Sequence, residues 1–210
     1  KIDKKNNKII SLRFDDNTNV TINPEDIVIS SLPINLTSKL LGYKSKLKFR
    51  GIRSVYLAYN QKKIIKGRNH WLYYGSEKIY FNRITEPKKL SKWVSPDKTS
   101  YLTAEITFSK NDKIDKYDSK KLVDKIADQV EEVGLIKKNK LIAGTDNKEY
   151  FVYPLLYKGY QEELAITKAK ISKFNQLYSI GTGGEYNYAD SQIIFEKAFD
   201  TAKIISNKES

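Results

Sequence analysis

The sequence contains no cysteine, no methionine and a single histidine. Without cysteine the chain has no disulfide, no catalytic thiol and no thiolate ligand for zinc, which fits a reducing, cytoplasmic environment. The lone histidine, His70, argues against a histidine-based catalytic triad and against a site where several histidines hold a metal, so we expect no metal. The missing methionines, an initiator among them, indicate a fragment of a longer protein.

Long apolar runs are also missing. No stretch reaches the roughly 18 apolar residues of a membrane-spanning helix, so we expect no membrane span. Residues 1–8 lack the apolar region of a signal peptide. Apolar residues nevertheless make up 40% of the 210, which is enough to bury the core of one large domain or two small ones.

Basic residues outnumber acidic ones, 38 to 25, which gives a net charge of +13. Such a balance favours anionic partners such as nucleic acid, nucleotide phosphates or acidic lipid. The lysines are scattered, however, as expected for a solvated surface in a protein of lysine-rich composition. We therefore predict no nucleic-acid partner, and keep a basic domain that binds an anionic polymer as an alternative.

Apolar periodicity and turn residues predict strands in the first two thirds of the chain and helices mainly later. This order indicates an α+β fold with a mixed or antiparallel sheet. Strands are expected over 8–14, 19–22, 27–33, 49–59, 71–74, 79–84, 101–108, 149–155 and 177–180, with a hairpin turn at 75–78. Helices are expected over 35–41, 118–133 and 161–174, and from Asp190 onward.

The most informative segment follows the last strand, where Gly181, Gly183 and Gly184 precede a helix that Asp190 opens. A strand, a glycine-rich turn and a helix N-terminus together can bring backbone N–H groups against an electron-rich ligand. The alternative is a tight connection that needs glycine only for its backbone angles. The spacing is not that of the dinucleotide-binding fingerprint, so this pattern alone leaves both interpretations open.

A few polar side chains are further candidates for a site. Tyr186 and Tyr188 follow the glycines, and phenol groups can hydrogen-bond phosphate oxygens or stack on rings. Arg83 lies on an aromatic-rich strand, and its fork of donors suits a phosphate or a ring carbonyl. An ion pair between Arg83 and Glu86, or another acid, is an equally good interpretation.

Four segments, in this order, resemble motifs of UDP-galactopyranose mutases and of the related protoporphyrinogen-oxidase-like, amine-oxidase-like FAD enzymes. They are Asp26-Ile-Val-Ile-Ser-Ser-Leu-Pro33, Phe81-Asn-Arg-Ile-Thr-Glu-Pro-Lys88, Tyr153-Pro154 with Gly159-Tyr160, and Ser179-Ile-Gly181 followed by Glu185-Tyr-Asn-Tyr-Ala-Asp190. Each motif is weak by itself, but their order and spacing match over nearly the whole chain.

The resemblance implies the C-terminal part of an FAD-dependent oxidoreductase whose N-terminal dinucleotide-binding half is absent. It implies that residues 1–33 belong to the FAD-domain side, that 34–155 form the substrate domain, and that 156–210 add the closing strand and helix of a Rossmann-like FAD domain. FAD would contact Gly181, Thr182, Gly183, Gly184, Asp190 and Ser191. A small-molecule or nucleotide-sugar substrate would contact Arg83, Tyr153, Tyr186 and Tyr188.

Two departures separate the chain from the mutases. Thr182 stands where those enzymes usually have arginine, and Ser191-Gln192 replaces a pair that usually begins with methionine. The resemblance thus implies a flavoenzyme, either a mutase of surface-polysaccharide synthesis or an oxidase relative. We expect these 210 residues alone to be inactive, to bind FAD weakly or not at all, and to expose an apolar edge where the absent half would dock.

Overall fold

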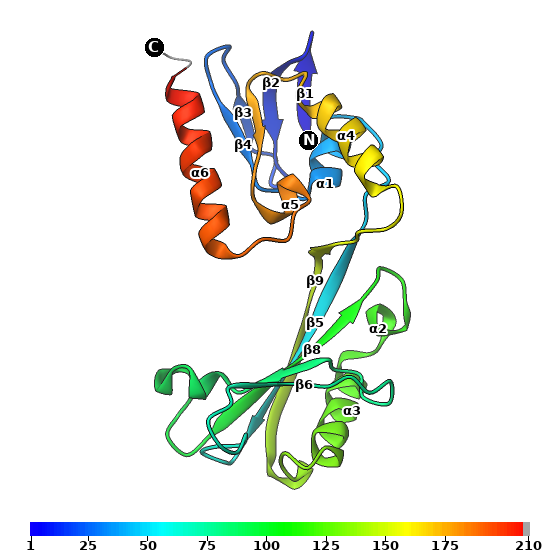
Figure 1. The fold of residues 1–210 in the computed structure, drawn as a ribbon, viewed down its shortest axis with the longest axis vertical. Coiled ribbons are helices and arrows are strands. Elements are labelled where there is room, and N and C mark those ends of the chain that lie inside the picture. The colour runs from blue at the N-terminus through cyan, green and yellow to red at the C-terminus, as the bar shows by residue number, and fades with distance from the viewer. Residues whose placement is uncertain (208–210) are drawn as a thin grey trace. The chain divides into compact units, whose positions relative to one another are not determined.

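The computed structural model describes residues 1–207 and divides the chain into two compact units. Unit 1 comprises Lys1–Phe49 together with the chain from Tyr153 onward, and unit 2 comprises Arg50–Val152 (Figure 1). Unit 2 is thus inserted into unit 1 along the chain. Each unit has its own buried apolar cluster, so each is described by itself.

Unit 1 combines two small sheets with four helices. Strands β1, β2 and β3 form an antiparallel sheet, and β4 pairs with β10 in parallel. The strands are β1 (Ile2–Lys5), β2 (Lys8–Arg13), β3 (Asn19–Thr21), β4 (Val28–Ser30) and β10 (Leu177–Ser179). The helices are α1 (Ile34–Leu40), α4 (Tyr160–Ile171), α5 (Gly181–Glu185) and α6 (Ser191–Ser206).

The core of unit 1 joins segments that are far apart in the sequence. Ile9, Ile34, Leu41 and Phe174 are buried together. Gln176 ties the two sheets to each other, because its side chain accepts a hydrogen bond from the N–H of Ile9 and donates one to the carbonyl of Asn23. The parallel pair β4–β10 is thereby fixed against the hairpin.

Unit 2 is built on a sheet of five strands in the order β6–β7–β8–β5–β9. The pairs β6–β7, β7–β8 and β8–β5 are antiparallel. The strands are β5 (Phe49–Tyr59), β6 (Trp71–Tyr73), β7 (Arg83–Thr85), β8 (Ser100–Phe108) and β9 (Leu141–Pro154). The helices are α2 (Lys113–Lys116) and α3 (Ser119–Glu132), with short 3₁₀ turns η1 (Pro87–Lys89), η2 (Lys92–Val94) and η3 (Lys138–Lys140).

One face of this sheet is covered by α3 and the alternation of β5 and β8 decides which face it is. Alternate residues point to one side of a strand, so Leu57 and Leu102 lie on the same face. That face packs against the apolar stripe Leu122, Ile126 and Val130 of α3. Asp118 caps the N-terminus of the helix, because its side chain accepts a hydrogen bond from the N–H of Lys121.

The mixture of helices with mostly antiparallel sheets confirms the α+β expectation, but several local predictions were wrong. The strand β1 was missed, the hairpin partner of β6 begins only at Arg83, and β9 starts at Leu141 instead of Glu149. The expected turn at Gly181–Gly184 is the short helix α5. Among the described residues, no helix has the length and apolar character needed to cross a membrane.

Candidate functional site

The glycine-rich segment follows β10 directly, at the carboxyl end of a parallel strand pair. Gly181 has φ +78°, a left-handed conformation that glycine adopts without strain. A Cβ placed at Gly181 would meet no atom within 4 Å, so this position borders open space. The carboxyl ends of parallel strands are where open α/β sheets bind ligands, and the first N–H groups of a helix lack intrahelical acceptors.

Gly183 and Gly184 have a packing explanation instead. A Cβ at Gly184 would lie 3.0 Å from Ser179 Oγ and 3.2 Å from the Ser30 carbonyl oxygen, so a larger residue would push α5 off the strand pair. The Ser179 hydroxyl also donates to the carbonyl of Gly184 at 2.8 Å. At Gly183, a Cβ would approach Pro33 at 3.4 Å. These two glycines seat α5 on β4 and β10.

Tyr186 takes a structural position. Its side chain is 2% exposed, and its hydroxyl oxygen lies 2.6 Å and 2.8 Å from the carbonyl oxygens of Lys48 and Leu155. Its ring packs edge-on against Phe49 with centroids 5.1 Å apart. Burial raises the pKa of the phenol. The expectation that Tyr186 faces a ligand therefore does not fit, since its hydroxyl and ring are both engaged inside unit 1.

Tyr153 and Tyr188, in contrast, are brought together from distant parts of the sequence. Their ring centroids are 5.0 Å apart, and Tyr188 is 63% exposed. Tyr188 stands in the connection between α5 and α6, beside Asp190. Asp190 occupies the N-cap position of α6, but its side chain makes no capping hydrogen bond, and both Asp190 and Ser191 are exposed.

The helix α6 carries apolar side chains on more than one side. Within α6, which the structure describes throughout, no residue is buried. One stripe of α6 is partly buried and faces the rest of unit 1. It consists of Ile194, Lys197, Thr201 and Ile205. Phe195 and Phe199 are 67% and 68% exposed on one flank of that stripe, and Ile193 and Ile204 are 41% and 53% exposed on the other. The structure thus leaves apolar side chains uncovered on both flanks of α6.

Arg83, in unit 2, is held by an acid that the sequence did not single out. Its Nε and one Nη each donate to the Glu105 carboxylate at 2.8 Å, across the β7–β8 pair. Hydrogen bonding to Glu105 raises the pKa of the guanidinium, which stays charged. The other candidate partner, Glu86, is fully buried and bound elsewhere.

The Arg83–Glu105 pair lies on the sheet face opposite α3, where it borders a shallow pocket of about 320 Å³. Trp71 and Tyr73, on the neighbouring strand β6, are 48% and 68% exposed beside it. Strand alternation sorts the residues within each strand, but only the register across β6, β7 and β8 shows that Glu105 and the two aromatic residues share a face with Arg83. Among residues 1–207, no group of three or more metal-ligating side chains is present.

Comparisons with known proteins identify the fold. A scan against models of protein families finds no match, and neither does a search of the curated proteins. Among solved structures, reduced UDP-galactopyranose mutase matches 85% of this chain with a TM-score of 0.70 and 18% identity. A protein described as a protoporphyrinogen oxidase, from Exiguobacterium, matches 87% with a TM-score of 0.63 and 13% identity.

An oxidoreductase from Methanosarcina mazei also matches 87% of the chain, with a TM-score of 0.50 and 15% identity. The chain spans only 39% of the mutase, 40% of the Exiguobacterium protein and 43% of the Methanosarcina protein. The likeness in structure confirms the resemblance seen in the sequence: this chain has the fold of part of these larger proteins.

Proposed function

We propose that this chain is the C-terminal part of an FAD-dependent oxidoreductase or sugar-nucleotide mutase. Its substrate domain would be unit 2, Arg50–Val152, which is shorter than the range 34–155 expected from the sequence because residues 34–49 belong to unit 1. In this proposal unit 1 supplies the closing strand and helix of the FAD domain. The observation that carries the proposal is a likeness in fold that runs through both units yet accounts for only about two fifths of each larger protein. The motif order in the sequence supports it independently.

The exposed apolar surface of unit 1 supports the proposal that part of the FAD domain is absent. Parallel strands normally lie in sheets that are covered on both faces, whereas β4–β10 has two strands among the described residues and leaves Ile29 57% exposed. The uncovered flanks of α6 add Phe195 and Phe199. The hypothesis that the dinucleotide-binding half is absent predicts an exposed apolar area of this kind.

The residues proposed to contact FAD are those from Gly181 to Gly184, with Asp190 and Ser191. Gly181 fits this role by its open surroundings, while Gly183 and Gly184 hold α5 in place. When bound, the flavin would supply the redox or nucleophilic chemistry, and the chain would orient it and stabilise charge. Arg83, Tyr153 and Tyr188 are the proposed substrate contacts, and Tyr186 is left out because its hydroxyl is occupied.

A titration with FAD tests whether most FAD contacts lie outside these 210 residues. The 210-residue chain should bind FAD weakly or not at all, whereas the full-length protein should retain flavin through purification. The visible flavin absorbance after gel filtration reports both. A stoichiometric yellow complex of the short chain would contradict the proposal, and so would a full-length protein that binds no flavin.

Turnover separates the two chemistries. A mutase would interconvert ring forms of a nucleotide sugar only with reduced flavin, and would fit a role in cytoplasmic synthesis of surface polysaccharide. An oxidase relative would instead reduce its flavin with an amine or a carbon-centred substrate. Thr182, in place of the usual arginine, favours a substrate other than that of the strict mutases.

Paired arginine variants test the substrate face. Arg83→Met in the full-length protein should raise KM or abolish turnover, because it removes the charged fork on the open sheet face. Arg50→Met is the matched control, since Arg50 is exposed and its guanidinium donates a 3.3 Å hydrogen bond to the Thr107 hydroxyl. Equal activity of the two variants would rule Arg83 out as a substrate contact.

A further inference from the structure

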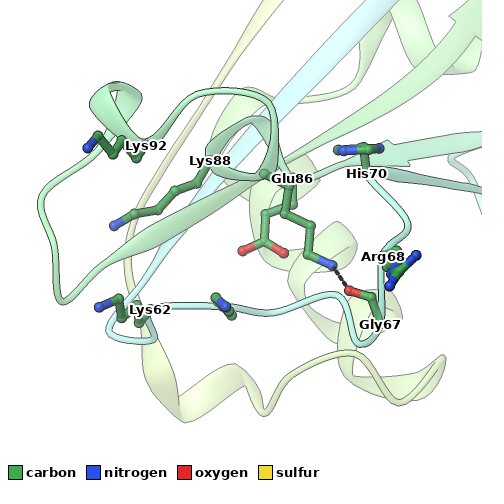
Figure 2. A pocket seen from close by; sticks show the side chains of 9 residues that line it. Lys62, Gly67, Arg68, His70, Glu86, Lys88 and Lys92 are labelled. Atoms are coloured by element: carbon green, nitrogen blue, oxygen red, sulfur yellow. Dashed lines mark hydrogen bonds between the residues drawn. The ribbon is translucent and has the colours of Figure 1, made fainter.

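A second feature of unit 2 lies in two adjacent loops, 60–70 and 86–99, and is not used by the proposed function. These loops contain eight cationic residues, namely Lys62, Lys63, Lys66, Arg68, Lys88, Lys89, Lys92 and Lys98. The only acids in the two loops are Glu86, which is buried, and Asp97. The loops enclose a cleft of about 540 Å³. Figure 2 shows Lys62, Lys88 and Lys92 pointing to one side of this cleft, with Arg68 and His70 at its other end.

The loop 86–99 also presents large apolar side chains to solvent. Leu90, Trp93 and Val94 are 62%, 83% and 44% exposed. Trp93 is the most exposed large apolar residue in the described part of the chain, and the ammonium group of Lys92 lies 4.6 Å from the centre of its ring. A positive charge thus lies directly beside the exposed apolar side chains.

The tip is rigidly presented because three side chains at the base of the loop brace it. Lys88 donates to the carbonyl groups of Pro96, Asp97 and Thr99, which uses its three N–H donors. Lys89 donates to the carbonyls of Gly67 and Asn69, at 2.8 Å and 2.9 Å, and so ties the first loop to the second.

Glu86 is the third side chain that braces the loop at its base. Its carboxylate accepts hydrogen bonds from the N–H groups of Ile64 and Ile65 and from the Ser100 hydroxyl. Exposure of Leu90, Trp93 and Val94 is therefore a property of a braced loop, in which the fold itself holds these side chains away from the core.

We propose that this loop pair docks unit 2 on the surface of an anionic lipid bilayer. Tryptophan is well suited to the boundary between headgroups and acyl chains, and the aliphatic Leu90 and Val94 would enter the same layer. Lysines near a negatively charged leaflet act as point charges that need no defined pairing geometry. The cleft between the loops would accept lipid phosphate groups.

The composition of the patch favours lipid over nucleic acid. Seven of its eight cations are lysine, whereas bidentate recognition of phosphates and bases favours arginine. Leu90 and Val94 offer no ring on which a base could stack. A protruding apolar tip also suits a deformable lipid layer better than a flat protein surface.

Vesicle sedimentation tests the proposal with the 210-residue chain. The chain should co-sediment with vesicles of equal parts phosphatidylcholine and phosphatidylglycerol, but not with phosphatidylcholine alone, and added salt should weaken binding. Leu90→Ser combined with Trp93→Ser should lower the partition coefficient at least about tenfold. Lys62→Glu combined with Lys92→Glu should reduce it similarly and flatten its salt dependence.

Two controls keep the test specific. Phe195→Ser combined with Phe199→Ser, on α6, should leave vesicle binding unchanged, which separates this surface from the apolar face of unit 1. The tryptophan fluorescence of the chain should shift to shorter wavelength on anionic vesicles. This shift should vanish in Trp93→Phe, which retains Trp71. Loss of binding in the α6 variant, tighter binding to single-stranded DNA than to vesicles, or Trp93-dependent dimers without vesicle binding would overturn the proposal.

Discussion

Arg53 provides the sharpest test of how unit 2 is held together. Its side chain is fully buried in β5, and its Nε lies 2.5 Å from Asp146 Oδ2 on β9. One Nη donates to the carbonyls of Ile114 and Tyr117 at 2.7 Å and 2.8 Å, and the other contacts Ser119 Oγ at 3.2 Å. A single guanidinium therefore connects the sheet to α2, to the start of α3 and to the residues between them.

Replacement of Arg53 by leucine should be costly because the partner charge stays behind. The Asp146 side chain is only 5% exposed, so its carboxylate would be left buried and unpaired. Removing one partner of a buried ion pair destabilises by about 3–5 kcal/mol. Arg50→Leu, on the same strand but exposed, should change the free energy of unfolding by less than about 0.5 kcal/mol.

A double variant separates the charge from the packing. Arg53→Leu combined with Asp146→Leu removes both charges and should recover a substantial part of the loss, since apolar replacement of a whole buried pair is often close to neutral. Urea unfolding followed by tryptophan fluorescence reports on this unit, because Trp71 and Trp93, the only two tryptophans, both lie in it. Equal stabilities of Arg53→Leu and Arg50→Leu would refute the reasoning.

Three further predictions concern the buried hydrogen bonds of Glu86, Tyr186 and Asp146. Glu86→Gln should destabilise unit 2 by about 1–3 kcal/mol, because an amide offers one acceptor oxygen where the carboxylate offers two; an unchanged urea midpoint would show that the buried N–H groups find other acceptors. Tyr186→Phe should cost unit 1 about 0.5–1.5 kcal/mol, measured as faster amide hydrogen exchange in that unit alone, because the buried phenol loses its hydrogen bonding to the carbonyls of Lys48 and Leu155. Burial alone would raise the pKa of Asp146, but hydrogen bonds from Arg53 and Ser119 outweigh it and lower that pKa below its ordinary 3.8, so the stability it contributes is complete above that value and declines as the pH falls through the folded-state pKa. The urea midpoint of unit 2 should fall with acid for this reason, and the variant that replaces both charges by leucine should lose part of that dependence.

Prediction from sequence was most reliable where a single element decides its own form. The helix expected over 118–133 is α3, Ser119–Glu132, and its Asp118 cap and left-handed Gly134 are local features of the chain. Strands β5 and β8 alternate clearly enough to be identified by period alone. The four motifs that resemble flavoenzymes were also readable, because a motif needs only residue type and spacing, and the comparison of folds agrees with them.

Features that depend on neighbours in space were not predictable from the pattern. Register across β7 and β8 pairs Arg83 with Glu105, although Glu86 is much closer in the sequence. Tyr186 was indistinguishable from Tyr188 by composition, but packing buries one and exposes the other.

The sequence by itself determined the α+β class, most of the longer helices and strands, and the likeness to part of a larger flavoenzyme, because periodicity and motif spacing are local properties of the chain. Only the tertiary structure decided which apolar residues remain uncovered. Phe195 and Phe199 lie exposed on α6, although phenylalanine is a residue type commonly found in cores, and the fold holds Trp93 in solvent on a braced loop. Burial is a property of what packs against a side chain, and no residue carries that information alone.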